Sequence, residues 1–314
     1  MKKILLALAT TLLFPNMSHA AACVDGANAD GCTISTSDNT YTLTGDITTT
    51  GNDARGLFLS SSDNNITTIV GNISTGSVDG VTGDSANGLE LWYSNYNNTT
   101  LTGNISTTGG YAYGLKLYES SDNTTTLTGN ISTIGVDADG LYISHSHNNN
   151  TTLTGDISTF AVEYARGLVI AYSNGNTTNM TGNITTTGDE SHGLYLGNSN
   201  YNITTMTGDI STIGPNAVGL FLYYSNYNNT TMTGDISTIG PNAHGLFLSN
   251  SDNNTTTLTG DISTIGPNAH GLFLSNSDSN IVNLTGSLSA TGAGSYAIYA
   301  NSTSDNNTIN LTLN

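Results

Sequence analysis

The chain has 314 residues, of which 9% are charged, and its formal net charge at pH 7 is −18. Without the two lysines at positions 2 and 3, 3 basic residues stand against 23 acidic ones, which gives −20. This balance excludes nucleic acid and anionic lipid surfaces as partners, because a phosphate backbone requires clustered Lys and Arg.

Residues 1–20 have the pattern of a secretory signal peptide. Lys2 and Lys3 precede an apolar stretch from Ile4 to Phe14, and small residues stand at Ser18 and Ala20. The stretch is too short to span a membrane, and no later segment is long enough, so we expect no transmembrane segment in the mature chain. The pattern predicts export through the Sec pathway, to the extracellular space or the outer-membrane surface of a Gram-negative bacterium.

Residues 21–40 are predicted to form an N-terminal cap that covers the first unit of the repeats that follow. Its two cysteines, Cys23 and Cys32, are the only ones in the chain. An exported protein meets an oxidising environment, so we expect a Cys23–Cys32 disulfide, with two free thiols as the alternative.

Residues 41–314 repeat with a period of 26. The glycine of a Thr-Gly-Asp/Asn-Ile phrase recurs at Gly208, Gly234 and Gly260, and a second phrase, Gly-Leu-x-Leu, keeps the same interval. The period is interrupted within residues 76–85 and 161–165, which indicates loops on one side of the unit. A fixed period carried by two separate phrases predicts one structural unit, repeated about ten times.

Each unit contains short segments in which apolar residues alternate with Thr, Ser or Asp, as in residues 257–262. Alternation of this kind predicts strands, and turn residues separate them. Short strands bury their apolar face when units stack at the ~4.8 Å strand spacing. The prediction is therefore an all-β chain, a single parallel β-helix (β-solenoid) of about ten coils. Its inward ladders would include Met232 with Leu258 and Ile236 with Ile262, and turn asparagines would form ladders of their own.

The phrases TGDISTIGPNAHGLFL and TGNISTIGVDADGLYI resemble the repetitive passenger regions of bacterial autotransporters. The resemblance covers nearly all of residues 41–300. It implies a right-handed parallel β-helix, displayed on or shed from the outer membrane, with a structural or adhesive role. The sequence departs from that family in showing no C-terminal β-barrel, and its last residues stop within a repeat phrase, where end-to-end pairing at an open edge is expected.

One apolar position of the second phrase is predicted to face outward. Aromatic side chains occupy it in four neighbouring units: Tyr195, Phe221, Phe247 and Phe273. Exposed apolar stripes mark partner surfaces, and aromatic rings suit sugars. We therefore expect this stripe to bind a glycan or a protein on a host or neighbouring cell, and the alternative is that a loop packs over it.

A second face carries two outward columns of threonine. In three neighbouring units the columns comprise Thr205, Thr207, Thr231, Thr233, Thr257 and Thr259. Regular threonine columns resemble the ice-binding face of β-solenoid antifreeze proteins, which makes ice binding the alternative function. Thr is also a common exposed strand residue, and Val70, Asn179 and Asn283 interrupt the array.

The remaining charged and imidazole side chains follow the repeat. Asp209, Asp235 and Asp261 form a column that we expect to be solvated and not to bind calcium, and His244 and His270 are explained by repeat duplication. No metal site and no cofactor is predicted. The sequence shows no Ser-His-Asp set, phosphate loop or acid pair outside the repeat, and an exposed ion pair is expected for Glu163 and Arg166. We therefore predict that the chain is not an enzyme, with a polysaccharide-active β-helix as the least favoured alternative.

Overall fold

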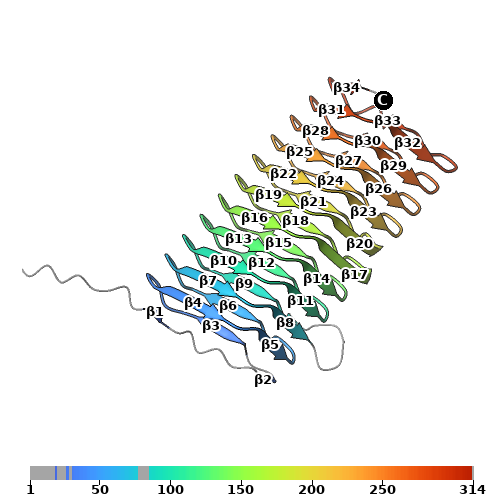
Figure 1. The fold of residues 1–314 in the computed structure, drawn as a ribbon. Helices are drawn as coiled ribbons and strands as arrows, with labels where there is room; N and C mark the ends of the chain where they lie inside the picture. The colour runs from blue at the N-terminus through green and yellow to red at the C-terminus, as the bar shows by residue number, and fades with distance from the viewer. Residues whose placement is uncertain (1–17, 20–25, 28–29, 77–84, 313–314) are drawn as a thin grey trace, which may run out of the picture.

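A computed structural model describes residues 18–19, 26–27, 30–76 and 85–312. The described residues form strands and turns without a helix, and the coils are stacked in one row from the N-terminal to the C-terminal end (Figure 1). Three parallel sheets run along this row, so the fold is the predicted β-solenoid, with about 10 turns of roughly 26 residues. No helix in the described part of the chain could cross a membrane.

Sheet A contains the first strand of each repeat unit. Its strands, in spatial order, are β1 (Ser18–His19), β4 (Thr40–Thr44), β7 (Ile66–Val70), β10 (Asn98–Thr102), β13 (Thr124–Thr128), β16 (Asn150–Thr154), β19 (Thr177–Thr181), β22 (Ile203–Thr207), β25 (Asn229–Thr233), β28 (Thr255–Thr259), β31 (Ile281–Thr285) and β34 (Thr308–Thr312).

Sheet C follows sheet A in each coil, after the turn that contains the Thr-Gly-Asp/Asn phrase. Its strands are β2 (Gly26–Ala27), β5 (Ile47–Thr50), β8 (Ile73–Gly76), β11 (Ile105–Thr108), β14 (Ile131–Ile134), β17 (Ile157–Glu163), β20 (Ile184–Asp189), β23 (Ile210–Ile213), β26 (Ile236–Ile239), β29 (Ile262–Ile265) and β32 (Leu288–Thr291).

Sheet B closes the coil and carries the Gly-Leu-x-Leu phrase. Its strands are β3 (Cys32–Ile34), β6 (Leu57–Ser60), β9 (Leu89–Trp92), β12 (Leu115–Tyr118), β15 (Leu141–Ser144), β18 (Leu168–Ala171), β21 (Leu194–Gly197), β24 (Leu220–Tyr223), β27 (Leu246–Ser249), β30 (Leu272–Ser275) and β33 (Ile298–Ala300).

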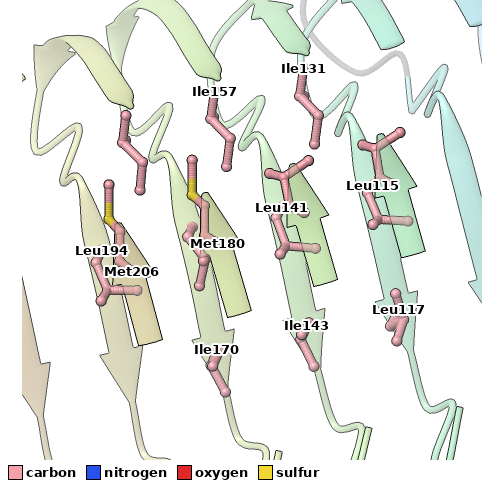
Figure 2. Packing of buried hydrophobic residues seen from close by; sticks show 14 of the residues in the cluster. Leu115, Leu117, Ile131, Leu141, Ile143, Ile157, Ile170, Met180, Leu194 and Met206 are labelled. Atoms are coloured by element: carbon pink, nitrogen blue, oxygen red, sulfur yellow. The ribbon is translucent and has the colours of Figure 1, made fainter. Parts of the chain in front are cut away.

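Equivalent residues of the repeat lie over one another from coil to coil. Met232 pairs with Leu258 across sheet A, and Ile236 pairs with Ile262 across sheet C, so the predicted aliphatic ladders are confirmed. Figure 2 shows such side chains projecting from all three sheets into the same interior. Burying one Leu or Ile contributes about 1.5–3 kcal/mol, and a continuous ladder provides that burial in every coil.

The repeated glycines are required where two sheets meet. A Cβ built on Gly219, at the start of β24, would lie 2.3 Å from Cγ2 of Ile236 and 2.7 Å from the carbonyl oxygen of Gly245. Gly234, in the turn between sheets A and C, has a φ of +141°, which L side chains rarely adopt. Both glycine phrases therefore reflect the backbone path of the coil.

A column of buried asparagines holds the turn between sheets B and A. The Asn228 side chain donates from Nδ2 to the carbonyl oxygen of Ser199 at 2.8 Å, and its Oδ1 accepts the backbone N–H of Asn202 at 2.8 Å. The same pattern recurs from Asn97 to Asn280. This arrangement confirms the expected amide ladder, and it satisfies turn backbone groups that would otherwise be buried without partners.

The N-terminal predictions concern residues that are described only in part. β1 lies within the expected signal peptide, and β1, β2 and β3 pair with the first full coil through β4, β5 and β6. Cys32 is buried in β3, whereas Cys23 lies outside the described residues. The signal peptide, the cap boundary and the Cys23–Cys32 disulfide therefore stay predictions.

Candidate ligand-binding groove

The aromatic side chains predicted to form a stripe lie on the outer surface of sheet B. Tyr195, Phe221, Phe247 and Phe273 stand in register in β21, β24, β27 and β30. The rings of Phe221 and Phe247 stack with centroids 4.8 Å apart, and those of Phe247 and Phe273 stack at 4.5 Å. Stacking covers the ring faces, so along most of this stripe a ligand would meet ring edges.

The stack ends at Tyr195. Its ring is tilted by 56° from that of Phe221, with centroids 5.5 Å apart, because it leans across Gly197 in the same strand. The equivalent position in the other strands from β6 to β30 carries a side chain: Ser60, Trp92, Tyr118, Ser144, Ala171, Tyr223, Ser249 and Ser275. A single missing side chain therefore interrupts the ladder.

A hollow of about 330 Å³ opens at this interruption, near the lower end of the ~300–1,000 Å³ range of small-ligand sites. It is lined by Tyr164, Arg166, Glu190, His192, Tyr195, Phe221 and Tyr223. A second hollow of about 230 Å³ is lined by Glu190, His192, Asn216, Val218, Phe221, Asn242, His244 and Phe247. Because Glu190, His192 and Phe221 border both hollows, we treat them as one feature, the aromatic groove.

The groove lies between sheet B and the turns that connect sheets C and B. One of these turns contains the predicted one-residue insertion, and there β17 extends to Glu163 with a shift in register between Phe160 and Glu163. Tyr164 follows directly, with a φ of +58°, and reaches the first hollow. The insertion thus helps to build one wall of the groove.

The histidines beside the groove act as acceptors for the backbone. Nδ1 of His192 accepts the N–H of Val218 at 3.1 Å, and Nδ1 of His244 accepts the N–H of His270 at 3.0 Å. Burial lowers the pKa of His192 to about 3 and that of His244 to about 4, so both rings are neutral near pH 7. With Nδ1 accepting, the proton of each ring is on Nε2, which makes that atom a donor. No His, Cys, Asp and Glu side chains cluster as a metal site in the described residues.

Arg166 forms an ion pair with Asp139, not with Glu163, which corrects the pairing expected from the sequence. The guanidinium Nε lies 3.3 Å from Oδ1 of Asp139, whose carboxylate also accepts the backbone N–H of Arg166 at 2.7 Å. Residue 139 stands one coil before residue 166, so the coil register brings the two together. The carboxylate of Asp139 is fully buried, and desolvation raises its pKa to about 6 despite the adjacent Arg166.

The N-terminal part of the same surface carries a second ion network. Glu90 replaces the aromatic residue in β9 and is fully buried between Arg55 and Lys116, whose Nζ lies 3.0 Å from Oε1 of Glu90. The Lys116 ammonium also lies 5.2 Å from the rings of Trp92 and Tyr113. The aromatic stripe is therefore not continuous along the solenoid, and the groove begins at the turn that contains Tyr164 and Arg166.

The threonine columns lie on the outer surface of sheet A, on a different side of the coil from the groove. Thr205, Thr231 and Thr257 are in register, as are Thr207, Thr233 and Thr259. The predicted geometry of two parallel columns is therefore present, and whether ice binds to it stays a prediction.

The aspartate column supports the backbone. Oδ1 of Asp209 accepts the N–H of Asp235 at 2.8 Å, and Oδ1 of Asp235 accepts that of Asp261 at 2.8 Å. Oδ1 of Asp261 accepts the N–H of Ser287, and this bond lowers the pKa of Asp261. Each carboxylate thus accepts a backbone N–H of the next coil, and these hydrogen bonds account for the column without a bound cation.

Several groove residues, and the glycine beneath Tyr195, were not predicted as site residues: Tyr164, Glu190, His192, Asn216 and Tyr223 line the groove, and Gly197 lies under the Tyr195 ring. One signal for them was present in the sequence, since Gly197 is the glycine at a position that otherwise carries a side chain. Alignment of the repeat units would have marked that coil as irregular.

No protein-family model matches the chain, and no curated protein matches it. Among solved structures, it is similar to the periplasmic alginate epimerase AlgG, with 12% identity and a TM-score of 0.32 over 88% of this chain and 77% of that one. A single-residue variant of the same epimerase matches with 11% identity and a TM-score of 0.29, over 87% and 77% of the two chains.

These matches correct the prediction that the chain is not an enzyme. Solved structures of an epimerase are among those similar to the chain, and the prediction is therefore withdrawn. At identities of 11–12% the likeness concerns the fold alone.

Proposed function

We propose that the chain is an exported β-helix with a structural or adhesive role, and that it binds a glycan through the aromatic groove. The observation that carries this proposal is the hollow between Tyr195 and Phe221, where the aromatic ladder is interrupted. The resemblance to autotransporter passengers and the expected signal peptide support a location at the cell surface or outside the cell.

The chemistry of the groove suits a sugar. Phe221 and Tyr195 offer apolar surface to ring C–H groups, Glu190 offers acceptor oxygens, and the neutral His192 offers its Nε2–H as a donor. A sugar presents the complementary groups, since its hydroxyls both donate and accept hydrogen bonds. The two hollows adjoin along successive coils, so the groove accommodates more than one sugar unit.

A glycan array screened with the purified mature chain tests the proposal, followed by titration calorimetry with the best ligand. Tyr195→Ala and the triple replacement of Phe221, Phe247 and Phe273 by Ser should each abolish or strongly weaken binding. Tyr227→Ala is the control, because Tyr227 is an exposed aromatic residue outside the groove. Binding that survives in the groove variants would overturn the assignment.

Ice binding is the second candidate, and the register of the two threonine columns on sheet A favours it. Flat columns of hydroxyl and methyl groups at the ~4.8 Å strand spacing can order water. Thermal hysteresis of the purified chain is the measurement. Its absence at high protein concentration, with ice crystals of normal shape, would dispose of this candidate.

A further inference from the structure

Every cation in the described residues is engaged by a carboxylate. Arg55 contacts Asp30 and Glu90, Lys116 contacts Glu90, and Arg166 contacts Asp139. Of these three cations only Arg166 lines the aromatic groove. The groove thus contains one positive charge, already balanced by a buried negative one.

The rim of the groove adds uncompensated negative charge. Glu190 borders both hollows, and Asp189 stands next to it, paired in register with Glu163 of the neighbouring coil. These carboxylates raise the pKa of the Tyr164 hydroxyl. Glu190 makes the largest contribution, and Glu163 and Asp189 act in the same direction. A ligand in the first hollow would be exposed to their electric field.

We infer that the groove selects uncharged sugars and rejects glycans built of uronic acids, because its one cation is paired with Asp139 while Glu190 lines both hollows, with Asp189 next to it in the chain and Glu163 paired with Asp189. This inference rests on the proposed glycan-binding function and names its ligand class. A uronate carboxylate placed in the first hollow would meet Glu190 without a free cation to balance it.

Arg166 still has donors to offer a neutral ligand. The Arg166–Asp139 contact uses Nε and one terminal nitrogen, each 3.3 Å from a carboxylate oxygen. A guanidinium has five N–H groups in all, so others remain for sugar hydroxyls. The fully buried Asp139 holds Arg166 in place and cancels its charge. Arg166 can thus donate hydrogen bonds to a ligand while its positive charge is balanced by Asp139.

The test compares binding of a neutral and a uronic-acid oligosaccharide of equal length and linkage, by titration calorimetry at low and high salt. We expect the uronic-acid ligand to bind at least about tenfold more weakly at low salt, with the gap narrowing at high salt as the repulsion is screened. Both titrations are repeated with calcium and with a chelator.

Two variants change the charge of the site. Asp139→Asn retains an oxygen for the Arg166 backbone N–H and releases the guanidinium charge, so binding of the uronic-acid ligand should improve relative to the neutral one. Glu190→Gln removes the rim charge, so it should also improve binding of the uronic-acid ligand relative to the neutral one. Asp209→Asn is the control: it removes an equal charge from the aspartate column, where Asn183 shows that Asn also accepts the next backbone N–H.

The outcomes separate the inference from the function on which it rests. The inference is supported if the neutral ligand binds, the uronic-acid ligand binds more weakly, and both groove variants reduce this difference in affinity. If the uronic-acid ligand binds as tightly as the neutral ligand or more tightly, with or without calcium, the inference is overturned and the proposal of glycan binding stands. If neither ligand class binds, on the array or in solution, both proposals fail.

Discussion

The phenol ring of Tyr195 lies directly over the backbone of Gly197, two residues further along the same strand. A Cβ at residue 197 would lie 2.4 Å from the Tyr195 hydroxyl oxygen and 2.6 Å from Cε1 of its ring. The ring therefore occupies space that a side chain fills in the other full coils. The interruption of the aromatic stack beside the groove follows from this relationship.

Gly197→Ala should close the groove while preserving the fold. Gly197 is not in the positive-φ region, so alanine fits the backbone, but its methyl group displaces the Tyr195 ring from its place over residue 197. We expect an unchanged circular dichroism spectrum and at least about tenfold weaker glycan binding. Ser275→Ala, at the equivalent position of another coil, is the control. Unchanged affinity in Gly197→Ala would show that the tilt of Tyr195 is irrelevant to binding.

Two buried threonines should respond differently to replacement by valine. Oγ1 of Thr238 donates to the carbonyl oxygen of Ala243 at 2.6 Å, whereas the buried Oγ1 of Thr230 has no hydrogen-bond partner. Thr238→Val should lower the free energy of unfolding by about 1–3 kcal/mol, because it leaves a buried carbonyl unsatisfied. Thr230→Val should be neutral or stabilising. Urea unfolding monitored by circular dichroism measures both, and equal losses would contradict this account.

The buried asparagine ladder should be more sensitive than the exposed strand position beside it. Asn228→Ala removes the acceptor for the Asn202 backbone N–H and the donor to the Ser199 carbonyl. We expect a loss of about 2 kcal/mol or more in the free energy of unfolding. Asn229→Ala changes the next residue, which is exposed, and should cost little. A comparable loss in both variants would argue against the ladder as a source of stability.

Stability should decline as the pH falls from about 7 to 4, since protonation of the groove histidines disfavours the folded state. Their folded-state pKa values, about 3 for His192 and about 4 for His244, lie below the ordinary histidine value of 6.5. The unfolded chain thus binds more protons in that window. Asp139, with its pKa raised to about 6, acts in the opposite direction and partly offsets the loss.

His244→Asn isolates the histidine contribution. Asn is the natural residue at this repeat position in another coil, where Oδ1 of Asn87 accepts the N–H of Tyr113 at 2.8 Å. The variant keeps the acceptor and removes the titrating group, so its free energy of unfolding should depend less steeply on pH between about 6.5 and 4. An identical slope in the parent and the variant would refute the assignment.

The sequence alone was sufficient to predict the fold, because in a solenoid the contacts between coils join residues that are one repeat period apart. Residues separated by one period, such as Met232 and Leu258, pair in adjacent strands, and the two glycine phrases mark where the backbone turns or approaches its neighbour closely. The outward position of Phe221 and Phe247 followed from the alternation of strand residues.

The groove was decided by tertiary structure, because it depends on departures from the repeat. The tilt of Tyr195 over Gly197 and the pairing of Arg166 with Asp139 join side chains whose orientations are set by local space and charge. Periodicity specifies which residues become neighbours, but it does not determine the rotamers of their side chains. That choice depends on packing around one missing side chain and one inserted residue, and only the folded coil brings these together.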